Sequence, residues 1–177
     1  KDRMELLLKL ADVIEDNAEE LARLESRNVG KPWWVAVDEP GLMADNLRFF
    51  AGAARNLEGK AAAEYVEGYT SMIRREPLGI VAGICPWNYP LFMAMWKMGP
   101  ALAAGNVQII KPAEQTPLTM LRFVELALLE VSASDHELCC ADLLNVVDAP
   151  PEKGERARGD SLCLFEVALR AVNLGER

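Results

Sequence analysis

Apolar residues recur at the three- and four-residue spacing of an amphipathic helix from the start of the chain. This pattern predicts a first helix that ends near Asn28-Val29-Gly30, where Pro32 follows as a stop signal. A second helix is expected over residues 43–57. The positions expected to face inward are Leu7, Leu10, Ile14, Ala18 and Leu21 in the first helix and Leu47, Phe50, Ala51, Ala54 and Leu57 in the second.

Short apolar runs alternate with helical segments further along the chain. Residues 69–75 predict a short strand, and residues 80–85 form a continuous apolar run, which is typical of a strand covered on both faces. The elements expected next are a helix over residues 91–104, a strand over 107–110, a helix capped by Thr116 that ends near Glu130, and a strand over 143–147. This βαβαβ order predicts an α/β fold containing half of a doubly wound sheet. Ligands of such sheets bind beyond the carboxyl ends of the strands.

The chain changes character after Val147. A charged run, EKGERARGD, has the composition of a linker, and the apolar segment SLCLFEVALRAV follows it. We expect that segment to form a helix, which could cover part of the apolar face that three strands leave open. The expected organisation is one domain over residues 1–147 and a divergent tail of unknown role over residues 148–177.

Composition narrows the class of protein. The chain has 177 residues, of which 51% are hydrophobic and 26% are charged, and its net charge is -8. Such values are typical of a soluble globular domain, and the acidic balance argues against a nucleic-acid partner. No apolar stretch has the length of a membrane span, and the first residues lack the order of a signal peptide. The cysteines form no CxxC pair, so a cytoplasmic location is expected.

The segment IIKPAEQTP follows one of the predicted strands. Lys111 and Glu114 lie three positions apart on a loop that Pro112 stiffens. A lysine and a carboxylate this close can hold a vicinal diol such as a ribose, and the carboxylate would repel a 2′-phosphate, favouring NAD over NADP. The alternative is a strand-exit loop with exposed charges, because short motifs match often by chance.

The segment ICPWNYP follows the neighbouring strand. Two prolines restrict this loop, and the amide of Asn88 could stabilise negative charge on a carbonyl oxygen. Trp87 and Ile84 offer apolar surface for an adenosine. Alternatively, Asn88 caps the helix that starts at Leu91 and Trp87 belongs to the core. On spacing alone, this structural interpretation is favoured.

The two segments together resemble the aldehyde dehydrogenase superfamily. Its PWN and KPxExTP motifs are both present, in order and at family spacing, within SMIRREPLGIVAGICPWNYPLFMAMWKMGPALAAGN and IIKPAEQTPLT. The resemblance runs over about residues 1–130, with LLNVV as a last match. The segment FFAGAARNLEGKAAAEYVEGYTSMIRR is most similar to gamma-aminobutyraldehyde dehydrogenases, with betaine aldehyde dehydrogenases as near relatives.

The resemblance implies a Rossmann-like NAD-binding domain and roles for individual residues. Asn88 matches the asparagine whose amide helps to hold the oxyanion of the thiohemiacetal. The strand end that lines the cofactor cleft corresponds to Ile84, Cys85, Pro86 and Trp87. Lys111 and Glu114 match the pair that binds the adenosine ribose, and Pro112 and Ala113 lie along the same wall. The strand near residues 69–77 matches part of the β-ribbon through which the family forms dimers or tetramers.

The family's nucleophilic cysteine and general-base glutamate have no match in this chain. Cys85 is interpreted as a small apolar residue at a strand end. His136, Cys139 and Cys140 do not have the spacing of a zinc site, so no metal is expected. Arg158-Gly159-Asp160 is a chance tripeptide, and Lys97 is interpreted as a helix-surface charge.

The leading hypothesis is an NAD-dependent aldehyde dehydrogenase that oxidises an ω-aminoaldehyde such as 4-aminobutanal, present here in an incomplete, inactive form. Asp38, Glu39 and Asp45 could attract a cationic substrate, although such acids more often solvate a helix start. The alternative is a non-catalytic module that binds a nucleotide or pairs with other subunits. A third interpretation is a truncated or frameshifted coding record.

Overall fold

The helices of the first third of the chain lie on one side of the molecule. The computed structural model describes residues 1–59, 63–134, 145–146 and 165–167. The first elements are α1 (Asp2–Asp16), α2 (Ala18–Val29), α3 (Trp33–Ala36) and α4 (Glu39–Ala53). The predicted stop is confirmed, because α2 ends at Val29 and is capped by Gly30, which has a φ of 76° and donates its N–H to Ser26 O.

Two details of these helices differ from the sequence prediction. The single helix expected up to residue 28 is broken at Asn17, whose side-chain Nδ2 donates to Val13 O at 2.8 Å. The second predicted helix starts at Glu39, with Pro40 in its first turn, and ends at Ala53. Leu57, expected to face inward, therefore lies beyond the helix and is 50% exposed.

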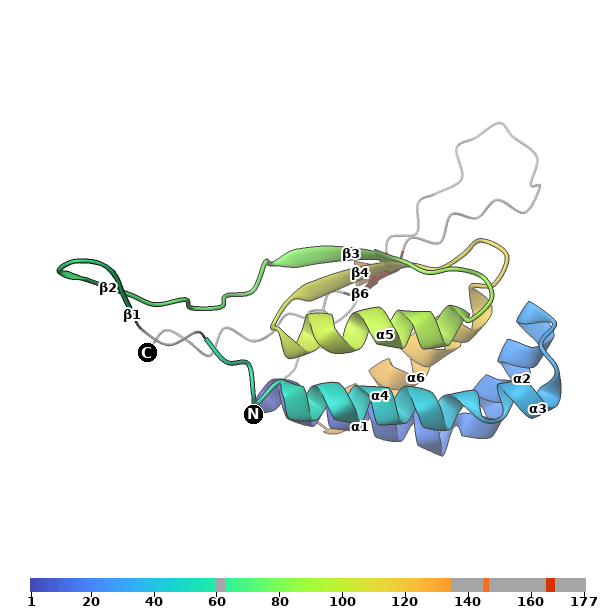
Figure 1. Cartoon of the computed structure of the whole chain (residues 1–177). Coiled ribbons are helices and arrows are strands. Elements are labelled where there is room, and N and C mark those ends of the chain that lie inside the picture. The colour runs from blue at the N-terminus through green and yellow to red at the C-terminus, as the bar shows by residue number, and fades with distance from the viewer. Residues whose placement is uncertain (60–62, 135–144, 147–164, 168–177) are drawn as a thin grey trace.

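Two sheets follow the helices. Strands β1 (Ala63–Val66) and β2 (Tyr69–Ser71) pair antiparallel in a ribbon that projects away from the helices (Figure 1). The second sheet has the strand order β3-β4-β6-β5. Its elements and intervening helices are β3 (Ile80–Ile84), α5 (Pro90–Ala103), β4 (Val107–Lys111), α6 (Leu118–Ser134), β5 (Asn145–Val146) and β6 (Phe165–Val167).

The predicted β-α-β-α-β order is present, and β3 and β4 are parallel. Strand β5 does not adjoin β4, because β6 lies between them and pairs antiparallel with both. The helix expected over residues 161–172 is wrong at Phe165–Val167, which form this strand. The remaining residues of that expectation lie outside the described part of the chain.

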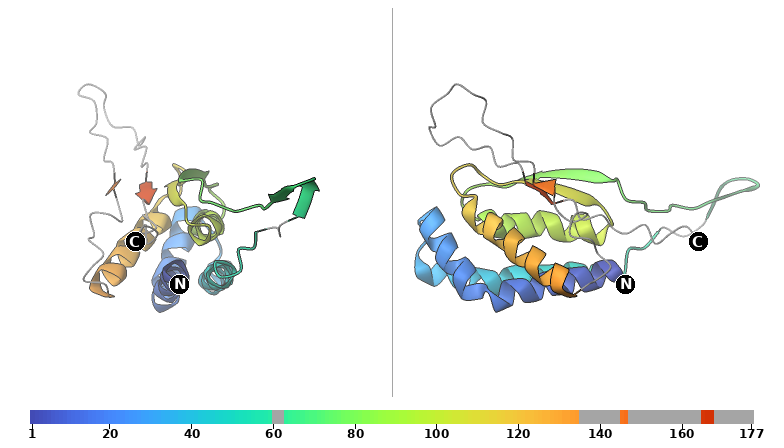
Figure 2. Two further views of the ribbon diagram at one scale, coloured as in Figure 1. Left: turned by 90° about the vertical axis from the view of Figure 1, so that its left-hand side faces the viewer. Right: turned by 180° about the vertical axis from the view of Figure 1, so that it is seen from behind.

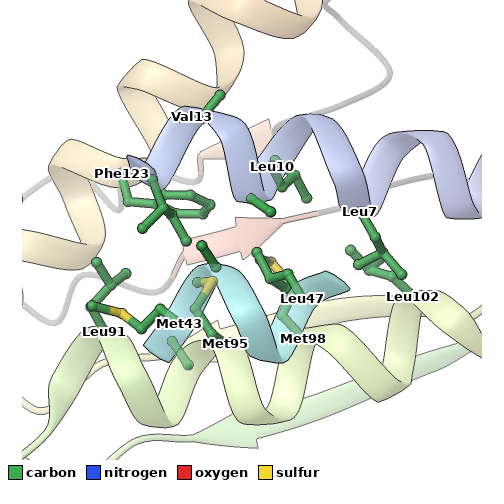
Figure 3. Close-up of a cluster of buried hydrophobic side chains, with 14 of the residues drawn as sticks. Leu7, Leu10, Val13, Met43, Leu47, Leu91, Met95, Met98, Leu102 and Phe123 are labelled. Atoms are coloured by element: carbon green, nitrogen blue, oxygen red, sulfur yellow. The ribbon is translucent and has the colours of Figure 1, made fainter. Parts of the chain in front are cut away.

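The core lies between the helices and one face of the sheet. Helices α1, α4, α5 and α6 lie on the same side of β3 and β4, with the ribbon of β1 and β2 extending away from them (Figures 1 and 2). Figure 3 shows buried side chains that meet between the helices, with Val13 of α1 pointing toward α6: Leu7 and Leu10 from α1, Met43 and Leu47 from α4, Leu91, Met95, Met98 and Leu102 from α5, and Phe123 from α6. Burial of this apolar surface stabilises the fold.

The opposite face of β3 is open, which corrects the expectation of a strand covered on both faces. Ile80 is 67% exposed and Ile84 is 74% exposed, whereas Gly83 is buried on the helix side. Within the described residues, no helix is long and apolar enough to cross a membrane.

Candidate functional site

The two segments singled out by sequence leave the sheet side by side. Ile84 and Lys111 are register partners at the ends of the parallel strands β3 and β4. Beyond them, the Cys85 N–H donates to Lys111 O at 2.9 Å, which extends the pairing by one further bond. We name residues 85–89 the Asn88 loop and residues 111–117 the Lys111 loop. Both loops begin at the carboxyl edge of the sheet, the position at which ligands of such sheets bind.

A buried hydroxyl ties the two loops together. Thr116 is only 3% exposed, and its Oγ1 donates to Trp87 O at 3.2 Å. The sequence predicts Thr116 as the cap of the following helix, but the hydroxyl is used across the loops instead. The backbone N–H of Leu118, the first residue of α6, is bound by the side chain of Asn28 at 3.1 Å. The relative position of the two loops is therefore fixed by a side-chain contact as well as by the sheet.

Lys111 and Glu114 form the pair that the loop spacing predicts. Lys111 Nζ lies 3.4 Å from Glu114 Oε1, and the two side chains are 29% and 54% exposed. The ammonium also lies 3.5 Å from Pro112 O. Between the two charged residues, Pro112 is buried and Ala113 is half-buried. One donor and one acceptor are thus presented together at the surface, which is the chemistry that two neighbouring hydroxyls require.

Asn88 does not cap α5, which was the structural alternative to a functional role for its amide. The residue that caps α5 is Tyr89, which uses no side-chain bond and accepts the Met93 N–H through its backbone carbonyl. Asn88 is exposed, and its side-chain amide has no hydrogen-bond partner among the described residues. Trp87 is 59% exposed and so does not belong to the core. The alternative based on helix capping is therefore wrong.

Cys85 lies at the base of the Asn88 loop and is 3% exposed. Burial raises the pKa of its thiol, and the charge of Lys97 offsets this only in part. A thiol must lose its proton to act as a nucleophile, so this environment disfavours attack on a substrate. Its packing in the main hydrophobic cluster agrees with its interpretation as a small apolar residue.

The acidic residues considered for a cationic substrate have different environments. Glu39 is 4% exposed, and its Oε1 lies 2.5 Å from Lys31 Nζ, so it is not available to a ligand. Asp38 and Asp45 are exposed around the start of α4. The candidate zinc ligands His136, Cys139 and Cys140 lie outside the described residues.

An aromatic row beside Asn88 was not singled out from the sequence. The ring centroids of Tyr89 and Phe92 are 6.4 Å apart, and those of Phe92 and Trp96 are 5.0 Å apart. Tyr89 is 40% exposed and Trp96 is 50% exposed, so the row lies at the surface of α5. The signal was the helical spacing of the aromatic residues from Tyr89 onward. Aromatic faces of this kind attract cations as well as apolar groups.

Comparison with known proteins matches most of the chain to a single protein family. A family model described as "Aldehyde dehydrogenase family" matches residues 1–134. The chain is 42% identical over 127 residues to a mitochondrial aldehyde dehydrogenase of Leishmania tarentolae, covering 71% of this chain and 25% of that protein. It is 48% identical over 126 residues to a betaine aldehyde dehydrogenase of Vibrio vulnificus, covering 71% and 26%.

Solved structures agree. The NAD+ complex of an aldehyde dehydrogenase from Bacillus cereus matches with a TM-score of 0.67 and 44% identity, covering 71% of this chain and 26% of that one. A betaine aldehyde dehydrogenase variant from Staphylococcus aureus, also in complex with NAD+, matches with a TM-score of 0.67 and 38% identity, covering 71% of this chain and 25% of that one. The chain thus spans about a quarter of the length of the proteins it matches.

Proposed function

Because this chain belongs to the aldehyde dehydrogenase family, we propose that it carries the adenosine-ribose site for NAD and the oxyanion-binding asparagine of an NAD-dependent aldehyde dehydrogenase. The observation that carries this proposal is the joining of two loops at one sheet edge. The Thr116 hydroxyl binds Trp87 O at 3.2 Å, which brings the loop of Lys111 and Glu114 against the loop of Asn88.

The residues present fit the adenosine half of NAD. Lys111 Nζ and Glu114 Oε1 lie 3.4 Å apart at the surface, so the ammonium can donate to one ribose hydroxyl while the carboxylate accepts from the other. Ile84 and Trp87 are 74% and 59% exposed and offer apolar surface beside the pair. The charge of Glu114 disfavours a 2′-phosphate, which selects NAD over NADP.

Asn88 supplies the proposed chemistry at the aldehyde. Its exposed amide can donate a hydrogen bond to the carbonyl oxygen of a substrate as negative charge develops there. When bound, NAD supplies the hydride acceptor for the oxidation. The restricted loop around Asn88 lowers the reorganisation needed to place this donor.

For the substrate, we propose an ω-aminoaldehyde such as 4-aminobutanal. The half-buried Phe92 ring and the exposed Trp96 ring, whose centroids lie 5.0 Å apart, support this choice, because aromatic faces attract a cationic amine. The match to a betaine aldehyde dehydrogenase, whose name indicates a cationic substrate, points in the same direction. A binding module that pairs with other subunits is the second candidate, favoured by the exposed Tyr65, Val66 and Tyr69 on the projecting ribbon.

The direct test is calorimetric titration of the chain with NAD. Replacing Glu114→Gln should weaken NAD binding by about 1–3 kcal/mol, because the neutral amide is a weaker acceptor for the ribose hydroxyl. The same substitution should weaken NADP binding less, because it also removes the negative charge that repels the 2′-phosphate.

Glu125→Gln is the matched control. Glu125 is an exposed carboxylate in an ion pair with a basic residue three positions away, Arg122, as Glu114 is with Lys111. It lies on α6 outside both loops, so NAD affinity should be unchanged. Equal affinities of the wild type and the Glu114→Gln variant would contradict the ribose assignment.

A further inference from the structure

Residues 28–31, which form the end of α2 and the start of the turn toward α3, contact both loops of the proposed site. Asn28 Nδ2 donates to Gln115 O at 3.3 Å, and Asn28 Oδ1 accepts the Leu118 N–H at 3.1 Å. These contacts join residues 87 and 90 positions apart in the chain. Both polar atoms of one side chain are therefore used on the Lys111 loop and the helix that follows it.

Both contacts lie just after Glu114, the second residue of the proposed ribose-binding pair. Gln115 directly follows Glu114, so a bond to its carbonyl fixes the peptide beside that carboxylate. Leu118 begins α6, and the first N–H groups of a helix have no partner within the helix. Asn28 supplies that partner from a different helix, which fixes where α6 begins relative to the loop.

Lys31, on the same turn, contacts the other loop. Its Nζ lies 4.1 Å from the centroid of the Tyr89 ring. The ammonium is held in place by Glu39 at 2.5 Å and by Glu25 at 3.5 Å, and the Lys31 side chain is only 7% exposed. A desolvated cation attracts an aromatic face more strongly than an exposed one does. Tyr89 directly follows Asn88, so a fixed ring restricts the backbone beside that amide.

The turn that carries Asn28 and Lys31 is itself closed by hydrogen bonds. Ser26 Oγ donates to Lys31 O at 2.7 Å, and the Gly30 N–H donates to Ser26 O at 3.0 Å. Gly30 has a φ of 76°, a conformation that other residues adopt at a cost. The two contacting residues are therefore presented by a compact support.

We propose that this turn, residues 28–31, positions both loops of the site. Asn28 sets the Lys111 loop for nucleotide binding, and Lys31 sets the Asn88 loop through Tyr89. Asn28 and Lys31 are thus positioning residues, with no contact to the ligand required. The proposal rests on the proposed function for what the loops bind, but its contacts can be tested without any ligand.

The first experiment compares Asn28→Ala, Asn28→Asp and the wild type. Amide hydrogen exchange by NMR reports on the Leu118 N–H, and calorimetry reports on NAD and AMP, which share the adenosine ribose. Asn28→Ala should speed Leu118 exchange and weaken both nucleotides by about threefold to tenfold, the effect of a lost hydrogen bond. Asn28→Asp keeps the acceptor for the Leu118 N–H and loses the donor to Gln115 O. The exchange of the Leu118 amide should therefore return to about the wild-type rate, whereas the affinity for both nucleotides should stay reduced.

Asn56→Ala is the matched control, because Asn56 makes one exposed side-chain bond, to Gly52 O at 3.4 Å, away from both loops. It should change neither readout. Unchanged Leu118 exchange in Asn28→Ala would overturn the proposed contact, and faster exchange with unchanged affinity would overturn the positioning role. If the wild type binds neither nucleotide, the proposed function fails, and Leu118 exchange alone decides whether Asn28 holds the loop.

The second experiment tests the contact of Lys31 with Tyr89. Tyr89→Phe keeps a ring over the ammonium, whereas Tyr89→Leu removes it without leaving the buried carboxylates unpaired. We expect Tyr89→Leu to broaden the backbone amide resonance of Asn88 by conformational exchange, and Tyr89→Phe to keep the wild-type line width. Phe92→Leu, which removes the neighbouring ring only, is the control. Identical Asn88 signals in the Leu and Phe variants of Tyr89 would overturn this half of the proposal.

Discussion

Glu25 and Glu39 share a single buried positive charge, that of Lys31. One oxygen of each carboxyl, Oε2, has no hydrogen-bond partner among the described residues. Burial raises the pKa of the Glu25 carboxyl, and the opposing effects of the Thr119 hydroxyl and of Lys31 are smaller. Burial also raises the pKa of the Glu39 carboxyl, against the opposing effect of Lys31. Two carboxylates around one ammonium carry an excess negative charge that is costly to bury.

This cluster predicts a pH dependence of stability. Because the folded pKa of Glu25 exceeds its ordinary value of 4.5, the folded state binds the proton more tightly than the unfolded state does. The stabilisation is present below the ordinary value and is lost as the pH rises through the folded pKa. Glu25→Gln cannot ionise, so its free energy of unfolding relative to wild type should rise as the pH rises from about 4.5 toward neutrality. Urea unfolding across that range measures it.

Glu130→Gln provides the comparison, because Glu130 is an exposed carboxylate on α6. Its stability relative to wild type should stay nearly constant over the same range. A Glu25→Gln variant that behaved like Glu130→Gln would mean that Glu25 is not buried with excess charge in solution.

At the scale of elements, α4 and α5 approach closely at Gly99. A methyl group at Gly99 would lie 2.6 Å from Phe50 Cδ2 and 3.2 Å from Phe50 Cγ, so the ring would have to move. Overpacking costs about 1–3 kcal/mol, and the better helix propensity of alanine offsets up to about 1 kcal/mol of it. We therefore expect Gly99→Ala to lower the free energy of unfolding by about 1–2 kcal/mol, as measured by chemical denaturation.

The same substitution on the partner helix should have the opposite sign. Gly52 lies within α4, and a methyl group there would meet no atom within 4 Å. Gly52→Ala should raise the free energy of unfolding by up to about 1 kcal/mol through helix propensity alone. Equal effects at the two glycines would show that α4 and α5 do not pack closely at Gly99.

Elements defined by local signals could be predicted from the sequence, and long-range side-chain contacts could not. Gly30 and Pro32 mark the end of α2, and the apolar runs mark β3 and β4. The adjacency of the Asn88 and Lys111 loops followed from the general geometry of parallel strands. The bonds of Asn28 to residues 87 and 90 positions away have no local signature, because asparagine before a turn is common for other reasons.

The exposed face of β3 shows a second limit of prediction from the sequence. A continuous apolar run has no period that distinguishes one face from the other, so residues 80–85 could not indicate that Ile80 and Ile84 are exposed. Phe165–Val167 illustrate the opposite case, since a short apolar run suits a helix and a strand alike. Pairing with β4, at Ile110 and Phe165, decides in favour of the strand.

At the scale of the whole molecule, we predict that the chain binds NAD but does not catalyse aldehyde oxidation. With NAD and 4-aminobutanal, we expect this chain to form no NADH, followed by absorbance with an active aldehyde dehydrogenase as positive control. Cys85 is the cysteine in the described part of the chain, and its burial and raised pKa disfavour attack on an aldehyde. Cys85→Ser should therefore leave both NAD affinity and the absence of turnover unchanged. Turnover that Cys85→Ser abolishes would make Cys85 the nucleophile against its environment, and turnover that survives the substitution would require a nucleophile elsewhere in the chain.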